Sequence, residues 1–137
     1  MKSVNEIIIE VDNAIDTYVR TSGVEGVGLF ASRDFQKGET LVDFFKSVKS
    51  HYVMKFSDLS DEQIRKNWYI PINDEYCVTC DKWTKYSYIN HSRTPNSSCE
   101  IVNGKVKADR FIKKDDEILM DYRCEYRPNR ISFPNWI

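Results

Sequence analysis

Short runs of β-branched and aromatic residues recur along the chain, and residues that favour turns separate them. Runs of this composition and length predict β-strands rather than helices. The dipeptide Asn103-Gly104 lies between two of these runs and predicts a two-residue hairpin turn. The predicted strands are residues 7–11, 18–21, 40–45, 76–78, 100–102, 106–108 and 117–122.

One segment carries the signals of a helix. Ser60-Asp61-Glu62-Gln63 is a capping-box pattern, which predicts a helix that begins near Ser60 and runs to about Trp68. Pro71 prevents the helix from continuing further. Many short strands with one or two short helices predict a β-rich α+β fold. No repeat or low-complexity linker divides the 137 residues, so we expect a single domain.

Composition and charge narrow the class of protein. Hydrophobic residues make up 41% of the chain and charged residues 30%, the balance of a soluble globular protein. The formal net charge of -1 indicates no concentrated basic surface for nucleic acid. The first residues show no signal-peptide pattern, and Ile7-Ile8-Ile9 is too short to cross a membrane. We therefore expect a soluble, intracellular protein that binds neither membrane nor nucleic acid directly.

Two of the four cysteines, Cys77 and Cys80, have the C-x-x-C spacing of a metal site. No second pair with this spacing and no nearby histidine follows, so we expect reduced thiols and no metal. The alternative is a metal-stabilised structural protein built on this pair.

Four polar or glycine-containing segments stand out, and their order along the chain matters more than any one of them. Taken singly, each is typical of a turn or of an edge strand. The segments are Gly26-Val27-Gly28-Leu29-Phe30-Ala31, Phe35-Gln36-Lys37-Gly38-Glu39, Tyr88-Ile89-Asn90-His91-Ser92-Arg93-Thr94-Pro95-Asn96 and Asp115-Asp116-Glu117-Ile118-Leu119-Met120-Asp121-Tyr122.

In this order the four segments resemble the SET domain of protein-lysine methyltransferases. The resemblance covers about residues 18–122, with 1–17 as an N-terminal extension and 123–137 as a C-terminal tail of one domain, 1–137. The compact size is similar to that of the small stand-alone viral and bacterial members. The resemblance implies small curved β-sheets and a C-terminal pseudoknot, in which the chain end threads through a loop. That crossing would bring Asn90-His91 next to Tyr122.

The resemblance also implies a reaction and a cofactor. S-adenosylmethionine would donate a methyl group to a lysine amine by in-line displacement, leaving S-adenosylhomocysteine. Tyr122 would be the catalytic residue, with its hydroxyl beside the methyl group. The cofactor contacts would come from Gly26, Val27, Gly28, Asn90 and His91.

Aromatic residues supply material for an apolar channel that would lower the pKa of the substrate lysine by desolvation. The candidates are Phe44, Phe45, Tyr86, Tyr88 and Tyr126, together with Met120. The alternative for each aromatic residue is a place in the core. Met120 stands where relatives often carry Phe or Tyr that limits methylation, so we expect more than monomethylation.

The chain departs from the family pattern at several positions. Ser87 replaces a frequent arginine, Arg93 replaces a frequent cysteine, and Phe44-Phe45 stands where an acidic-Tyr pair is common. The cysteine-rich tail that often closes the site is absent, so we expect an aromatic lid instead, with Trp136 on the cofactor. Its other members would be Tyr126 and Phe133, and the alternative is a loosely ordered terminus.

Two functions stay open at this point. The first is methylation of a lysine-containing protein or peptide, for which a histone tail is one possibility. The second is a non-catalytic SET-like module that binds a peptide or the cofactor. Because small SET proteins can dimerise, a dimer is also open.

Overall fold

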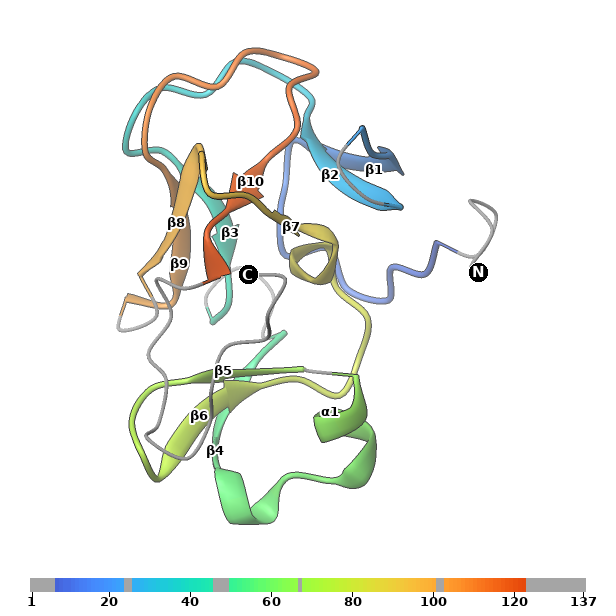
Figure 1. The fold of residues 1–137 in the computed structure, drawn as a ribbon, viewed down its shortest axis with the longest axis vertical. Helices are drawn as coiled ribbons and strands as arrows, with labels where there is room; N and C mark the ends of the chain where they lie inside the picture. Colours follow the sequence, from blue (N-terminus) through green and yellow to red (C-terminus); the bar gives the residue numbers. More distant parts are fainter. Residues whose placement is uncertain (1–6, 24–25, 46–49, 67, 101–102, 123–137) are drawn as a thin grey trace.

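A computed structural model describes residues 7–23, 26–45, 50–66, 68–100 and 103–122. Figure 1 shows two groups of strands, with a two-stranded and a five-stranded sheet above and a three-stranded sheet with α1 below. The chain enters the lower group once and returns through a short 3-10 helix, η3 (Lys85–Tyr88). The resulting structure is β-rich with few helices, as the sequence predicted.

The first sheet is an antiparallel hairpin of β1 (Thr17–Thr21) and β2 (Val27–Ala31). Its buried face carries Leu29 and Ala31, which are both fully buried. The predicted strand at residues 18–21 is therefore confirmed. The hairpin holds the glycines of the first motif at the edge of the upper group of strands (Figure 1).

The five-stranded sheet has the order β3-β9-β8-β10-β7. Its antiparallel part comprises β3, β9 and β8, and β10 runs parallel to both β8 and β7. Because β10 comes last in the chain yet lies between two earlier strands, it inserts into a gap that residues 90–97 leave open. The strands are β3 (Thr40–Asp43), β7 (Asn90–His91), β8 (Ser97–Glu100), β9 (Lys105–Ala108) and β10 (Leu119–Met120).

Side chains hold β10 in this gap, because a two-residue strand offers few backbone hydrogen bonds of its own. The Asn96 amide accepts a hydrogen bond from Leu119 N (2.9 Å) and donates one to Glu117 O (2.9 Å). The Ser97 hydroxyl donates to Leu119 O at 2.8 Å, and Ser92 N donates to Met120 O at 3.0 Å. Polar residues of the third motif thus fix the fourth motif in place.

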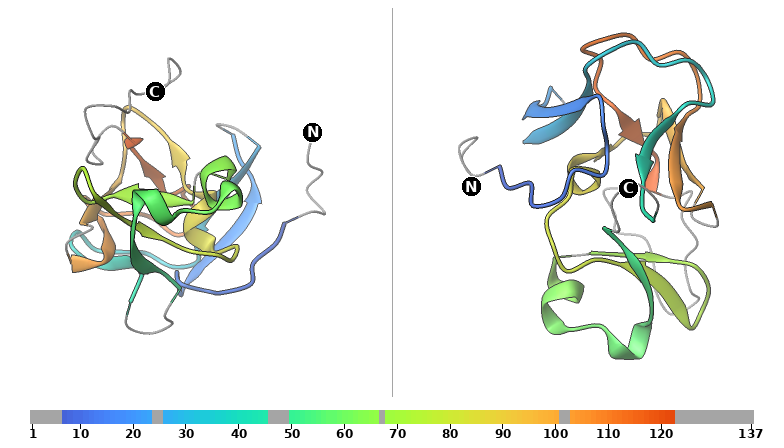
Figure 2. Two further views of the ribbon diagram at one scale, coloured as in Figure 1. Left: turned by 90° about the horizontal axis from the view of Figure 1, so that it is seen from below. Right: turned by 180° about the vertical axis from the view of Figure 1, so that it is seen from behind.

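The lower group is an antiparallel sheet of order β4-β6-β5, which the right-hand view of Figure 2 shows beneath the rest of the fold. Its strands are β4 (Tyr52–Lys55), β6 (Tyr76–Thr79) and β5 (Tyr69–Pro71), and the 3-10 helix η2 (Phe56–Asp58) follows β4. The short helix α1 (Asp61–Arg65) begins with the predicted capping box, in which Ser60 and Gln63 bond reciprocally. Gln63 is buried and also donates to Tyr52 Oη (3.0 Å).

One core joins the upper sheets to the lower one. Its fully buried members include Phe35, Phe44, Leu41, Ile112 and Ile118. Ile70 and Val78 of the lower sheet belong to the same cluster, which shows that the two groups of strands pack together. Within the described part of the chain, no helix is long and apolar enough to cross a membrane.

Several local predictions were wrong. Residues 7–11 form no strand, since Ile8 and Ile9 are exposed and only Val11 makes an isolated bridge, to Thr84. The helix ends at Arg65 rather than near Trp68, because Tyr69–Pro71 is recruited as β5 to pair with β6. The strand expected over 117–122 is confined to Leu119–Met120.

The predicted hairpin between β8 and β9 is present, but its turn is not the two-residue one. Among the described residues the ladder extends to the pair Glu100 and Lys105, so more residues than Asn103-Gly104 connect the two strands. Gly104 adopts a φ of +67° at the end of the connection, and a side chain there would collide with the ring of Phe45. Glycine is needed at this position for both reasons.

Candidate active site

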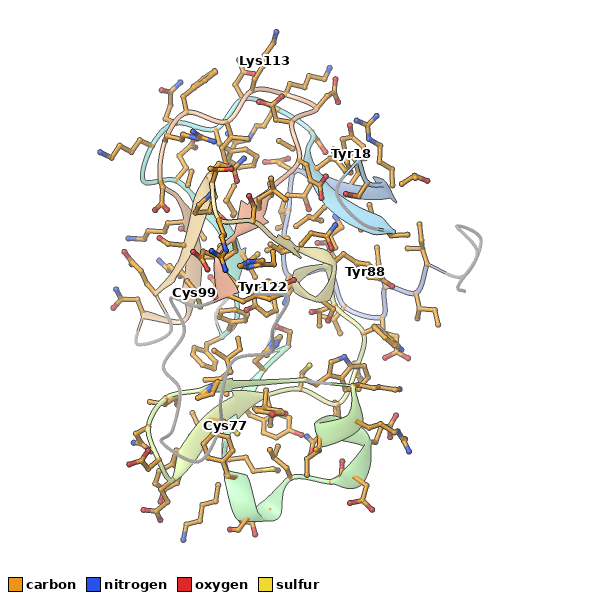
Figure 3. The ribbon with its side chains drawn as sticks, viewed as in Figure 1. Tyr18, Cys77, Tyr88, Cys99, Lys113 and Tyr122 are labelled. Atoms are coloured by element: carbon orange, nitrogen blue, oxygen red, sulfur yellow. The ribbon has the colours of Figure 1, made fainter. Side chains whose placement is uncertain are left out.

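The pairing of β10 with β7 places Tyr122 beside the Asn90-His91 dipeptide. Leu119 lies opposite Asn90 and Met120 opposite His91. Tyr122 N donates a hydrogen bond to His91 Nδ1 at 3.1 Å, and the two rings lie 5.1 Å apart. The Tyr122 hydroxyl donates to the carbonyl oxygen of Ile89, so the phenol is fixed at both ends. Figure 3 shows Tyr122 between the upper and the lower groups of strands.

Asn90 links this arrangement to the glycine motif. Its amide nitrogen donates to Val27 O (3.2 Å) and to Glu117 Oε2 (3.0 Å). The Ser22 hydroxyl lies 2.7 and 2.8 Å from the two oxygens of the same carboxylate. The Glu117 carboxylate therefore links Ser22, just after β1, to Asn90 at the start of β7. An isolated backbone bridge to Phe30 also holds Glu117 beside β2.

The two glycines of the first motif differ in what they require. A β-carbon on Gly28 would lie 2.9 Å from Glu117 Cδ and 3.1 Å from Ser22 Cβ, so the carboxyl group of Glu117 fills this space. Gly26 has a φ of +50° and no described atom within 4 Å of an added β-carbon. An added side chain at Gly28 would therefore displace the hydrogen-bonded Glu117 carboxyl group, whereas no described atom occupies the corresponding place at Gly26.

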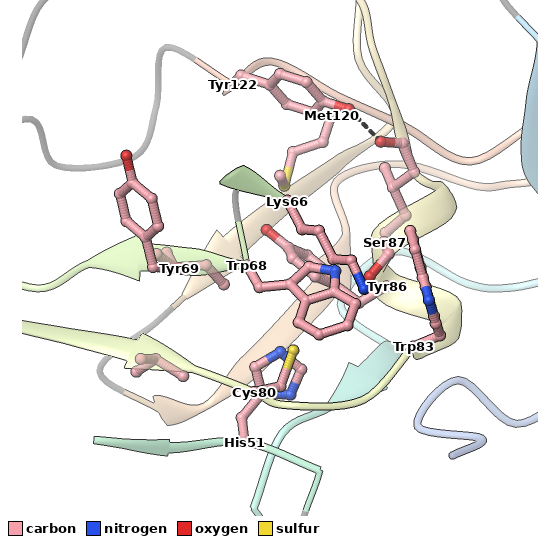
Figure 4. Close-up of a pocket in the computed structure, with 13 residues that line it drawn as sticks. His51, Lys66, Trp68, Tyr69, Cys80, Trp83, Tyr86, Ser87, Met120 and Tyr122 are labelled. Atoms are coloured by element: carbon pink, nitrogen blue, oxygen red, sulfur yellow. Dashed lines mark hydrogen bonds between the residues drawn. The ribbon is translucent and has the colours of Figure 1, made fainter. Parts of the chain in front are cut away.

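Tyr122 also borders a cavity of about 160 Å³ between the upper and the lower groups of strands (Figure 4). Its walls combine aromatic and aliphatic side chains with polar groups in about equal parts, and they come from both groups of strands. The lining residues are His51, Lys66, Trp68, Tyr69, Ile70, Val78, Cys80, Trp83, Tyr86, Ser87, Ile89, Met120 and Tyr122.

Of the residues expected in a substrate channel, Tyr86 and Met120 line this cavity with Tyr122. Phe44 does not line it, because it is fully buried with its ring against Tyr86 (5.0 Å) and His51 (4.7 Å).

The remaining channel and lid candidates lie elsewhere. Phe45 packs over Gly104. The Tyr88 hydroxyl bonds to both Ile8 N and Ile8 O, and its ring stacks on Trp83 at 6.3 Å. Tyr126, Phe133 and Trp136 lie outside the described residues.

The sequence reasoning missed the part of the cavity wall that the lower group supplies. His51, Trp68 and Cys80 come from the segment between the second and third motifs, which carries none of the family's residue patterns. Nothing local in this segment indicated that β5 and β6 fold back toward Tyr122. The arrangement depends on long-range strand pairing rather than on a motif.

Burial shifts the pKa of His51 and Cys80 in this wall and of Cys77 on the neighbouring strand β6. His51 is buried beside Ser50, whose hydroxyl lies 2.8 Å from Nδ1, and burial lowers the pKa of His51 to about 4. Burial raises the pKa of both Cys77 and Cys80 to about 11, which keeps them as neutral thiols at neutral pH. The described residues contain no group of three or more His, Cys, Asp or Glu side chains that could hold a metal ion.

Comparison with known proteins identifies relatives of this arrangement. The family model of the SET domain matches residues 26–123. Histone-lysine N-methyltransferase 2D from Homo sapiens is 24% identical over 127 residues, which cover 87% of this chain and 2% of that protein. Histone-lysine N-methyltransferase trr from Drosophila melanogaster is 26% identical over 127 residues, covering 87% of this chain and 5% of that protein. The chain thus spans only a small part of these relatives.

A solved structure shares the fold. The crystal structure of a candidate histone methyltransferase from Plasmodium falciparum superposes with a TM-score of 0.55 at 20% sequence identity. The match covers 78% of this chain and 92% of the other. At this level of identity the similarity supports the fold alone, which is the β-rich architecture described above.

The packing of Glu117 on Gly28 predicts a specific non-additive effect. Gly28→Ala should lower the free energy of unfolding by about 1–3 kcal/mol, because the methyl group overlaps the carboxyl group. Combining it with Glu117→Ala should cost less than the sum of the two single changes, by about 1 kcal/mol or more. Urea denaturation of the four proteins measures this coupling.

Gly23→Ala is the matched control, because no described atom lies within 4 Å of an added β-carbon there. Its effect should stay within about 0.5 kcal/mol. Additive costs for Gly28→Ala and Glu117→Ala would show that the glycine is required for another reason.

His51 predicts a loss of stability in acid. Its pKa falls from about 6.5 unfolded to about 4 folded, so the unfolded chain binds the proton more tightly. The stabilisation is complete above pH 6.5 and is lost as the pH falls toward 4, by roughly 3 kcal/mol in all. Urea denaturation across this range should show a flatter pH dependence for His51→Gln than for the wild type. Equal slopes for the two proteins would contradict the assignment.

Proposed function

Because the chain belongs to the SET-domain family, we propose that it transfers a methyl group from S-adenosylmethionine to the side-chain amine of a lysine in a protein substrate. The observation that carries the proposal is the position of Tyr122. Its hydroxyl is held by Ile89 O at the wall of a cavity rich in aromatic side chains, and its backbone is bonded to His91. A catalytic tyrosine would need this fixed orientation.

The residues around the glycine motif fit the cofactor that the family implies. Gly26 has a left-handed backbone, and no described atom lies within 4 Å of an added β-carbon, which would let a ligand contact the chain closely. Asn90 and His91 lie next to this segment and to Tyr122, so they would hold the same ligand. When bound, S-adenosylmethionine supplies an electrophilic methyl group on a sulfonium.

The cavity wall would prepare the substrate lysine. A lysine in water has a pKa near 10.4, and only its neutral form is nucleophilic. Met120, Ile89 and Ile70 offer no hydrogen-bonding side chains, so burial against them disfavours the ammonium form and lowers the pKa. The proton would be lost to water as the side chain enters the cavity.

Tyr122 would then orient the reacting groups. Its hydroxyl hydrogen is committed to Ile89 O, which leaves the phenolic oxygen as an acceptor for weak C–H···O contacts with the methyl group. The carbonyl of Ile89 is a second acceptor at the same place. Restricting the approach of the amine to one line saves part of the entropy of activation.

The substrate is proposed by analogy with the relatives, several of which are named for histone lysines. We propose a lysine-containing protein, with a histone tail as the first case to examine. The aromatic tail residues Tyr126 and Trp136 remain proposed as a lid that covers the cofactor.

Tyr122→Phe should lower the rate of methyl transfer on the order of 10²-fold, since it removes both the acceptor oxygen and the bond to Ile89. Transfer of labelled methyl groups to histones and to a protein panel measures the rate. Cofactor affinity, measured by calorimetry, should change only a few-fold. Tyr18→Phe is the matched control, because Tyr18 lies on β1, its hydroxyl donates to Asp115, and neither residue lines the cavity.

Full activity in Tyr122→Phe would rule out its catalytic role. Cofactor binding by the wild type without transfer to any substrate would favour the non-catalytic module.

Met120 should permit more than one methylation of the same lysine. Its unbranched thioether side chain leaves room in the cavity, and it has no hydroxyl group that could bind a water molecule there. Mass spectrometry of the product should therefore show di- or trimethyl-lysine. Met120→Tyr should shift the product toward monomethyl-lysine. A wild-type product that is only monomethylated would refute the expectation.

A further inference from the structure

Two tryptophans form a corner at the end of the cavity that lies away from Tyr122 (Figure 4). The rings of Trp68 and Trp83 are perpendicular, with centroids 5.0 Å apart. The ammonium group of Lys66 lies over both faces, 4.5 Å from the centroid of Trp68 and 5.2 Å from that of Trp83. A cation at this distance from two aromatic faces is attracted to both of them. The corner therefore already holds a cation.

Lys66 is not firmly fixed in this corner. Its other ionic contact is with Glu62, at 2.8 Å and one helical turn away, and the side chains of Lys66 and Glu62 are 30% and 56% exposed. Exposed pairs of this spacing contribute little to stability. The flexible side chain can keep Glu62 and water as partners when it moves out. Displacement of the Lys66 ammonium group by another cation should therefore cost little free energy.

The corner also holds a hydrogen-bond donor that the described protein does not use. Nε1 of Trp68 is buried and has no hydrogen-bond partner among the described residues. A buried donor without a partner is costly, which favours a ligand that brings an acceptor. Because Trp68 lines the cavity together with Lys66 and Trp83, a peptide bound there could supply a carbonyl oxygen.

We propose that the Trp68–Trp83 corner binds a basic side chain of the peptide substrate, close in sequence to the acceptor lysine, and that Lys66 occupies its place in the free protein. The inference rests on the proposed function, since the corner and Tyr122 border one cavity. Arginine fits better than lysine, because its planar guanidinium stacks on an indole face and is more weakly hydrated.

Binding of matched peptides tests the proposal without turnover. Each labelled peptide contains one acceptor lysine and one arginine, moved in turn through the flanking positions, and its twin carries neutral citrulline instead. At one position the arginine peptide should bind roughly 2- to 30-fold more tightly than its twin, the range of a desolvated cation over aromatic rings. Fluorescence anisotropy measures both affinities.

Two variants should act in opposite directions. Trp83→Leu should bring the ratio of arginine to citrulline affinities close to one, because it removes one wall of the corner. Lys66→Met should raise the affinity for the arginine peptide several-fold and leave the citrulline peptide unchanged, because the internal competitor is gone. Lys55→Met is the matched control, since Lys55 pairs with Glu75 at 3.6 Å outside the cavity lining and its loss should change neither affinity.

A purely structural role for Lys66 predicts weaker or unchanged binding in Lys66→Met, and that result would overturn the proposal. An arginine preference that survives Trp83→Leu, or no preference at any position, would do the same. Circular dichroism melting curves confirm that each variant is folded. Methyl transfer without an arginine preference would sink this inference alone, whereas an arginine preference without transfer would sink only the proposed function.

Discussion

The fold depends on a two-residue strand that is held from both sides. Leu119–Met120 lies between β7 and β8, parallel to both, and no local hydrogen bond could keep it there. The amide of Asn96 and the hydroxyl of Ser97 complete its backbone pairing. Since buried backbone groups must be paired, this insertion is possible only where the third motif supplies these partners. The motif thus acts first as a structural clamp.

The site follows from that clamp. Once β10 is in place, Tyr122 meets His91, and Glu117 reaches across to Ser22 and Asn90. The Glu117 carboxylate thus joins three segments that are far apart in the sequence, because it bonds to both Ser22 and Asn90. The same carboxyl group occupies the space that a side chain at Gly28 would need. The lower group of strands contributes aromatic side chains to the cavity wall. There the ammonium group of Lys66 lies over the rings of Trp68 and Trp83. The polar network fixes the geometry of Tyr122 beside this partly aromatic cavity.

The sequence predicted the β-rich class, the capping box at Ser60 and the meeting of Asn90-His91 with Tyr122, because each of these has a local or motif signature. It did not predict β4, β5 or β7, whose formation depends on partners distant in the sequence. Conversely, a strand was predicted at residues 7–11 and none formed. Ile8 and Ile9 have high strand propensity, but they are exposed and have no strand to pair with. The lining of the cavity was only partly foreseen, since Phe44 and Phe45 pack in or against the core while His51 and Trp68 line the cavity.

The insertion of β10 can be observed directly in solution. Nuclear Overhauser effects in an isotope-labelled sample report which backbone protons lie close together, and parallel pairing on both sides gives a distinct pattern. The account predicts contacts from residues 119–120 to both 90–91 and 97, together with a coupling across the hydrogen bond between Tyr122 N and His91 Nδ1. Contacts to only one of the two strands, or a Tyr122 amide that exchanges freely with solvent, would contradict it.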